Sequence, residues 1–186
     1  MKHVIAGIGV LAAMLIAPAA LAQSTAAKSQ VKRGEYLVTF GGCHDCHSPK
    51  VMTPDGPVPD KTRLLSGHRA DAVLPAVPQG VVGPEPNQWA ALTNSEFTAW
   101  VGPWGVSFAA NLTPDKATGL GGWTADQFIK TMRTGKHLGV GRPILPPMPW
   151  YDIMVLGDAD LKAIFAYLRS VPAVQNPVPA PIPPKG

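Results

Sequence analysis

Two cysteines and a histidine are the residues of this chain whose types and spacing point most directly to chemistry. Cys43, Cys46 and His47 form the pattern C-x-x-C-H, and the 186-residue sequence has no other cysteine. Two intervening residues place both sulfurs so that they can add to the vinyl groups of one haem, and the next residue brings an imidazole beneath the iron. The pattern therefore predicts one covalently bound haem c, with thioethers from Cys43 and Cys46 and with His47 as the proximal iron ligand.

Three other interpretations of the cysteine pair have weaker support. A disulfide between residues this close closes a very short loop and gives little entropic stabilisation. A thioredoxin-like redox pair belongs in a βαβ context, which the sequence does not show. A structural zinc site usually needs four ligands, and the chain has no second cysteine pair to complete one.

The first 22 residues have the pattern of a secretory signal peptide. A basic start precedes an apolar run over residues 4–20, and residues 20–22 (Ala-Leu-Ala) form a small-residue cleavage pattern. The run is short for a membrane span and no stop-transfer charges follow it. We expect cleavage after Ala22 and a periplasmic location, with membrane attachment only if this segment stays uncleaved.

Composition and charge indicate one domain whose core includes a cofactor. Of the 21 prolines and 19 glycines, 20 and 17 lie after residue 22, a content that approaches the range of disordered chains. Five Trp, five Phe and three Tyr nevertheless supply large apolar surfaces to bury. The formal net charge of +4 comes without a basic stripe interleaved with aromatic residues, so nucleic acid is not an expected partner.

A haem iron has a second axial position, and the sequence offers five candidates for it: Met132, Met148, Met154, His68 and His137. Met148 stands in the run LPPMPW, where prolines fix the backbone on both sides and can hold a weak thioether ligand in place. Met132 has apolar neighbours at helical spacing, which favours core packing, and we expect Met154 to pack beneath the last helix. Met148 is the favoured distal ligand, and His68 and His137 stay open as ligands of a bis-His haem.

Hydrophobic periodicity and capping signals predict three helices. The first covers residues 28–40 and is stopped by two glycines just before the haem motif. The second follows a capping box of Thr124 and Gln127 and ends at Gly135, and the third covers about residues 158–171. No alternating strand pattern stands out, so the expected fold class is all-α with long loops. The apolar face expected on the first helix consists of Val31, Leu37 and Phe40.

Four stretches resemble the class I c-type cytochromes, in particular the small bacterial periplasmic haem proteins that serve dehydrogenases. The first helix of the family is matched by RGEYL at residues 33–37, and its last helix by DLKAIFAYLR at residues 160–169. The ligand loop of the family is similar to MPW at residues 148–150. The loop and helix before that ligand loop are similar to residues 111–115 and 119–133. The resemblance implies a class I cytochrome c-like fold, with a few helices around one haem and with crossing first and last helices. It also implies that His47 and Met148 are the axial pair.

Two segments are not covered by the resemblance. One lies inside the expected cytochrome domain, residues 23–171, and the other is the tail that follows it. Residues 48–110 are much longer than the corresponding stretch in compact members, and they hold three tryptophans among many prolines and glycines. We expect a loop-rich cover of the haem edge there, with the tryptophans packed against the porphyrin or each other, rather than a partner-docking platform. The Pro-rich tail, residues 172–186, should be extended and polyproline-like, most simply as a linker or a fraying end.

The expected function follows from the predicted ligation. A Met/His haem has both axial positions filled, so single-electron transfer between periplasmic redox partners, by Fe(II)/Fe(III) cycling, is the expected reaction. Redox proteins are the expected partners, a periplasmic dehydrogenase among them. The alternative is a peroxidase-like haem enzyme or ligand sensor with an open distal site, and the sequence favours an electron-transfer protein or a dehydrogenase subunit over an enzyme on its own.

Overall fold

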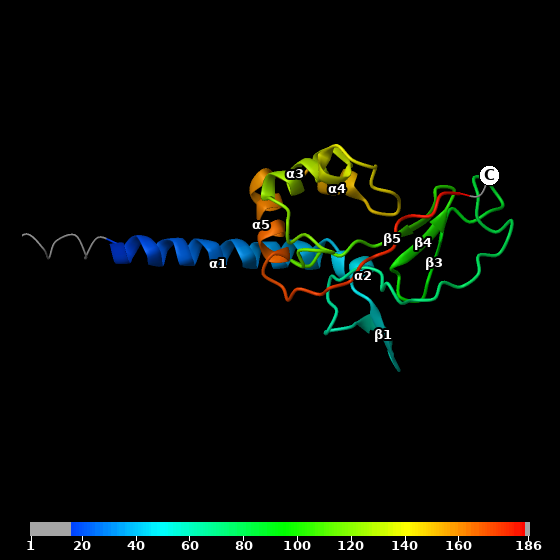
Figure 1. Cartoon of the computed structure of the whole chain (residues 1–186), viewed down its shortest axis with the longest axis horizontal. Coiled ribbons are helices and arrows are strands. Elements are labelled where there is room, and N and C mark those ends of the chain that lie inside the picture. The colour runs from blue at the N-terminus through cyan, green and yellow to red at the C-terminus, as the bar shows by residue number, and fades with distance from the viewer. Residues whose placement is uncertain (1–15, 185–186) are drawn as a thin grey trace, which may run out of the picture.

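The computed structural model describes residues 16–184 and shows one long helix leading into a small domain (Figure 1). Residues 1–15, which make up most of the expected signal peptide, lie outside the described residues. Helix α1 runs from Ile16 to Phe40 and therefore begins twelve residues before the predicted start. It ends where the two glycines predicted, because Gly42 adopts a left-handed conformation with φ 65°. Among residues 16–184, no helix is both long and apolar enough to cross a membrane.

The frame of the domain is the crossing of α1 with the last helix, α5 (Asp158–Leu168) (Figure 1). The two backbones approach closely at Gly34, where an added Cβ would collide with the backbone of Ala163. Arg33 and Asp160 form an ion pair across the same crossing, with Nε and Oδ1 2.9 Å apart. The crossing of the first and last helices agrees with the sequence expectation.

The buried face of α1 differs from the predicted one. Gly34 and Val38 face α5 and are buried, whereas Phe40 is 79% exposed and stacks on Tyr36, with ring centroids 5.9 Å apart. Leu37 contacts the core and is only partly buried. The close approach of α5 at a glycine selects the buried face, and apolar spacing on α1 alone does not reveal it.

Helix α3 (Ala125–Thr134) confirms its predicted boundaries. The hydroxyl of Thr124 accepts a hydrogen bond from the Gln127 amide at 3.2 Å, and the Gln127 side chain accepts one from the Thr124 amide at 2.9 Å. Gly135, with φ 62°, ends the helix. Phe128 packs on Phe165 of α5 with centroids 5.4 Å apart. The shared core consists of Val38, Leu65, Leu120, Phe128, Met132, Leu161, Ile164, Phe165 and Leu168.

The all-α expectation needs correction, because the domain is mostly helical but also contains two small antiparallel sheets. A hairpin pairs β1 (Lys50–Thr53) with β2 (Gly56–Pro59). A second sheet has the order β3 (Leu92–Thr93), β4 (Ala99–Gly102) and β5 (Gly105–Phe108). Each strand has two to four residues, so a period-two apolar pattern has no room to develop in the sequence.

Three short helices complete the description: α2 (Cys43–His47), the 3-10 helix η1 (His137–Gly139) and α4 (Trp150–Ile153). The Pro-rich tail follows α5 and returns across the domain to the β3–β5 sheet (Figure 1). Two backbone hydrogen bonds of 2.8 and 2.9 Å join Ile182 to Val106 of β5. The tail is therefore fixed to the domain at its far end, which differs from the linker or fraying end expected from composition.

Candidate haem site

The C-x-x-C-H motif forms the short helix α2 at the end of α1. Gly42 turns the chain between the two helices, and its carbonyl accepts a hydrogen bond of 2.9 Å from the Asp45 amide. Cys43 packs against the hydrophobic core, whereas His47 at the other end of the helix is buried, with 8% of its surface exposed. The motif is therefore held rigidly between the helical frame and residues 48–110.

The orientation of His47 suits an axial iron ligand. Its Nδ1 lies 2.8 Å from the carbonyl oxygen of Ala110. Because a carbonyl can only accept, Nδ1 carries the proton and Nε2 keeps a free lone pair. Burial is the main cause of the lowered pKa of His47, and the positive charge of Lys50 acts in the same direction. The imidazole is thus neutral, which is the form that binds a metal.

The two cysteines do not have the properties of a reactive thiol pair. Both are free and partly buried in the structure. Burial raises the pKa of the Cys43 thiol to about 11 and also raises the pKa of Cys46. Redox-active cysteines have lowered pKa values and are partly thiolate at neutral pH, so these thiols are unsuited to thiol exchange. Their environment agrees better with a structural, covalent role.

A cavity of about 580 Å³ opens beside the motif helix. Cys46, His47 and Met148 all line it. Apolar side chains dominate its walls, among them Trp100, Phe108, Leu112, Leu120, Phe128, Met132 and Ile144. Its volume lies within the roughly 300–1,000 Å³ of small-molecule and cofactor pockets. A large apolar space, one neutral imidazole and two adjacent cysteines fit a covalently attached haem.

The loop that carries Met148 is anchored by residues 48–110, the segment expected to cover the haem edge. The Ser107 hydroxyl on β5 donates to the carbonyl of Pro146 at 2.6 Å, and the Trp104 indole N–H donates to Ser107 at 3.2 Å. After the methionine, the backbone amide of Trp150 donates to the Met148 carbonyl at 2.9 Å. Ser107 therefore anchors the loop two residues before the methionine, and a local turn follows the methionine.

The five distal-ligand candidates divide into two groups. Met148, Met132 and His137 line the cavity, and the His137 ring meets the Trp123 ring edge-on, with centroids 5.0 Å apart. His68 and Met154 are not among the described residues that line it. His68 is 1% exposed, its Nδ1 lies 2.9 Å from the Thr98 hydroxyl, and its ring packs on Phe108 at 4.8 Å. His68 thus packs on β5 and contacts the residue that precedes β4.

The tryptophans of residues 48–110 have three different environments. Trp100 lines the cavity, Trp104 braces Ser107, and Trp89 is 66% exposed. The expectation that all three pack against the cofactor or each other therefore does not hold for Trp89. Five tail residues, 177–181, also line the cavity, and no feature of the sequence had indicated this. The hydrogen bond from His47 to the Ala110 carbonyl could not be predicted either, because every residue type has a backbone carbonyl.

Comparison with known proteins gives relatives that include cytochrome subunits of bacterial dehydrogenases. The chain is 32% identical over 150 residues to the gluconate 2-dehydrogenase cytochrome c subunit of Pantoea cypripedii, a match that covers 80% of this chain and 25% of the relative. It is 36% identical over 144 residues to the fructose dehydrogenase cytochrome subunit of Gluconobacter japonicus, covering 76% and 22%. It is 32% identical over 80 residues to the cytochrome c subunit of the quinone alcohol dehydrogenase of Gluconobacter oxydans (strain 621H), covering 41% and 16%. No protein-family model matches.

These similarities show that the chain has homologues among the cytochrome c subunits of bacterial dehydrogenases, in agreement with its C-x-x-C-H motif. Such homologues imply a haem c for this chain, whose Cys43, Cys46 and His47 form the matching motif. The chain spans about a quarter of the length of the first two of these relatives.

Proposed function

We propose that the chain is an exported mono-haem c-type cytochrome that transfers single electrons between periplasmic redox partners. The observation that carries the proposal is the shared cavity, which has His47 and Met148 on its walls together with Cys46 of the motif. The homology to cytochrome c subunits supports the same function. An electron-transfer protein or dehydrogenase subunit is a better description than an enzyme on its own.

Each residue of the site has a distinct task in this proposal. Cys43 and Cys46 hold the haem by thioethers, His47 supplies Nε2 as the proximal ligand, and Met148 supplies its sulfur as the distal ligand. The haem, when bound, supplies the change between Fe(II) and Fe(III). Ala110 fixes the His47 ring through Nδ1, and the apolar walls exclude water from the site.

The location and the partner are further parts of the proposal. Residues 1–22 act as a signal peptide that is cleaved after Ala22, residues 23–171 form the cytochrome domain, and the product is periplasmic. The partner is a dehydrogenase, because the relatives are named as dehydrogenase subunits. Affinity purification of the chain from its native host tests this part, since a stoichiometric dehydrogenase in the eluate is expected. Recovery of the cytochrome alone under gentle conditions would favour a free shuttle.

Haem attachment is tested on the purified protein. Acid and organic solvent should fail to extract the haem, and the pyridine adduct should give a c-type spectrum. The double change Cys43→Ala and Cys46→Ala should abolish covalent haem. Haem that washes out of the wild type, or normal covalent haem in the double variant, contradicts the assignment.

The distal ligand is tested by spectroscopy of the oxidised protein. Met148→Ala should abolish the weak sulfur-to-iron charge-transfer band in the near infrared and lower the reduction potential, because a soft thioether favours the ferrous state. Met154→Leu is the matched control, since Met154 lies away from the cavity lining and should leave the band intact. A spectrum that instead responds to His137→Ala would identify a bis-His haem. A wild type without the band that readily binds carbon monoxide would favour the open-site haem enzyme.

A further inference from the structure

The side chain of Lys50 makes three hydrogen bonds to the haem motif. Its ammonium nitrogen lies 3.0 Å from the carbonyl oxygen of His44 and 2.9 Å from that of Asp45, and it also donates to the carbonyl of Ser48. A lysine ammonium has three N–H donors and no acceptor, so three carbonyls use its full capacity. Lys50 is the first residue of β1 and lies three residues beyond His47. It therefore reaches back over the end of the helix that carries the motif.

The carbonyl groups at the C-terminal end of α2 need hydrogen-bond donors from outside the helix. The helix has five residues, so most of its carbonyls lack a partner within the helix. The Gly67 amide bonds the His47 carbonyl at 2.8 Å, and the Leu65 amide bonds the Ser48 hydroxyl at 2.8 Å. The Ser48 amide bonds the His44 carbonyl at 3.3 Å, and Lys50 shares that carbonyl and also donates to those of Asp45 and Ser48. Its side chain therefore completes the fixation of the attachment helix.

The contacts also hold a positive charge in a defined place. The Lys50 side chain is half-buried, and the burial lowers its pKa while the nearby carboxylates of Asp45 and Glu96 oppose that change. The carbonyl end of a helix is its negative pole, which favours a cation. A cation fixed beside a redox centre disfavours the more positively charged, oxidised state of that centre.

We propose that Lys50 is a positioning residue of the haem site, which clamps the end of the attachment helix and raises the reduction potential of the bound haem. The inference rests on the proposed function, because it needs a haem on Cys43 and Cys46. Nothing in residue type alone suggests the role, since an isolated lysine at the start of a hairpin is ordinarily a solvated surface charge.

Three substitutions in the haem-loaded protein separate the clamp from the charge. Lys50→Met keeps the length and removes donors and charge, Lys50→Gln keeps N–H donors without the charge, and Lys50→Arg keeps both. Redox titration should show a lower potential in Lys50→Met and Lys50→Gln and a potential close to wild type in Lys50→Arg. Thermal unfolding should show the largest loss in Lys50→Met, because only that change removes every donor.

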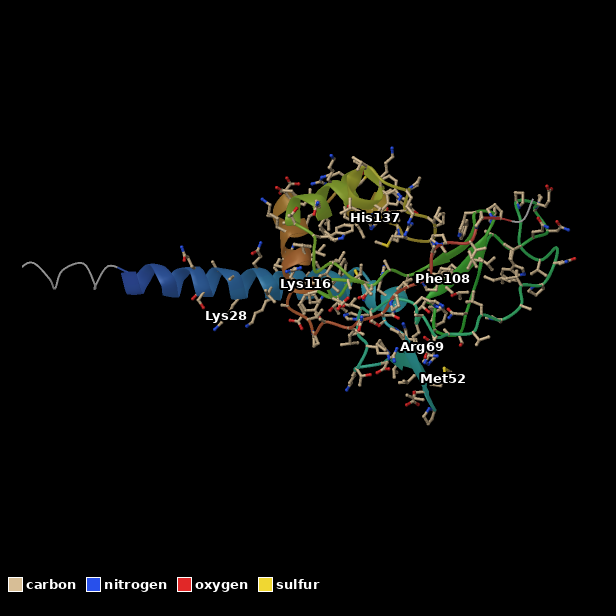
Figure 2. All side chains as sticks on the ribbon, viewed as in Figure 1. Lys28, Met52, Arg69, Phe108, Lys116 and His137 are labelled. Carbon is tan, nitrogen blue, oxygen red and sulfur yellow. The ribbon has the colours of Figure 1, made fainter. Side chains whose placement is uncertain are left out.

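Lys28→Met is the matched control. Lys28 is exposed on α1, far along the helix from the motif (Figure 2), and its replacement changes the formal charge by the same amount. The potential should not move in this variant. A potential in Lys50→Met equal to that of wild type, or a shift no larger than that of Lys28→Met, overturns the proposal.

The remaining outcomes are also decisive. If the neutral variants do not incorporate haem and Lys50→Arg does, the requirement for a cationic donor at the motif is supported directly. If Lys50→Arg incorporates haem but shows the lowered potential of the neutral variants, the positive charge does not set the potential and the electrostatic part is wrong. Failure of the proposed function is distinguishable from all of these, because the wild type itself would then lack covalent haem.

Discussion

The helical frame and the irregular part of the domain are held together in different ways. The frame, α1, α3 and α5, contributes most of the buried apolar core, whereas residues 48–110 contribute to the core cluster only Leu65. The buried side chains of the irregular part are mostly polar. Among the described residues, the buried polar side chains outside the three frame helices are His47, Ser48, Ser66, His68, Thr98, Ser107, Asn111, Thr113 and Asn176.

The difference follows from backbone chemistry. Helices satisfy their own amides and carbonyls, so their side chains are free to be apolar, whereas an irregular segment must find partners for buried backbone groups. Asn111 shows the consequence: its carboxamide accepts from the Thr113 amide at 3.0 Å and donates to the Val174 carbonyl at 2.8 Å. The irregular part should therefore depend on a few polar side chains as strongly as the frame depends on its core.

Truncation of the frame core should have the largest effect on stability. Leu161 lies in the first half of α5 and has no exposed surface, so Leu161→Ala should reduce the free energy of unfolding by about 2–5 kcal/mol. Denaturant unfolding of the haem-loaded protein, followed by circular dichroism, measures the loss. The neighbouring exposed residue provides the control, and Lys162→Ala should change little. Equal effects of the two changes would contradict the assigned core.

The polar counterpart of Leu161 is Asn176 in the tail. Its side-chain amide donates to the carbonyls of Ser66 and His68, both at 2.8 Å, and its oxygen accepts from the Ala70 amide at 3.0 Å. Asn176→Ala leaves these groups without that partner and should cost about 1–3 kcal/mol. The tail should then become sensitive to proteolysis, which mass spectrometry of a timed digest detects.

Gln175→Ala is the control for the tail, because Gln175 is the exposed neighbour of Asn176. It should leave both stability and the digest unchanged. If Asn176→Ala is as stable and as protease-resistant as Gln175→Ala, the tail is not clamped and the comparison of the two regions fails.

A smaller effect is expected at Ser107, where the irregular part meets the ligand loop. Ser107→Ala removes the hydrogen bond to the Pro146 carbonyl and should cost about 0.5–1.5 kcal/mol. The near-infrared band assigned to Met148 should weaken, because the loop is less well fixed. Ser95→Ala, at an exposed position of the same segment, serves as the control. A full-strength band in Ser107→Ala would show that the prolines alone hold the loop.

The same contrast explains what the sequence could predict. Helices α3 and α5 were predictable because capping residues and apolar spacing are local properties, and Gly41 and Gly42 marked the end of α1 in the same way. The strands were not, because two to four residues are too few for a period-two apolar pattern, and the tail was not, because its partner is distant in sequence, as in the pairing of Val106 with Ile182. No local pattern records such a partner.

The residues of the candidate site also differ in whether the sequence could predict them. The motif residues and Met148 could be named from residue type and spacing, and their roles as ligands stay predictions for the experiments above. The residues that orient them act through a backbone carbonyl at Ala110, one hydroxyl at Ser107 and the ammonium of Lys50. Such supports have common residue types, so only a three-dimensional arrangement distinguishes them from ordinary surface residues.

The smallest effect is expected for the ion pair between Arg33 and Asp160, which joins the two frame helices at the surface. The hydrogen bond from Arg33 is the main cause of the lowered pKa of Asp160. A carboxylate with a lowered pKa in the folded state adds stability above its unfolded value of about 3.9, and this stability is lost as the pH falls through the folded value. Asp160→Asn should therefore reduce the free energy of unfolding slightly at neutral pH and make that free energy fall less steeply in acid. Added salt should reduce the difference in stability between the variant and the wild type.

A double-mutant cycle can isolate the ion pair from the other contact of Arg33. Because Arg33 also lies over the Tyr36 ring, 5.5 Å from its centroid, Arg33→Gln removes two interactions. A double-mutant cycle with Asp160→Asn, measured by thermal unfolding between neutral and acidic pH, isolates the ion pair. A coupling as large as the loss in Leu161→Ala would contradict the view that apolar packing is the main stabilising interaction of the frame.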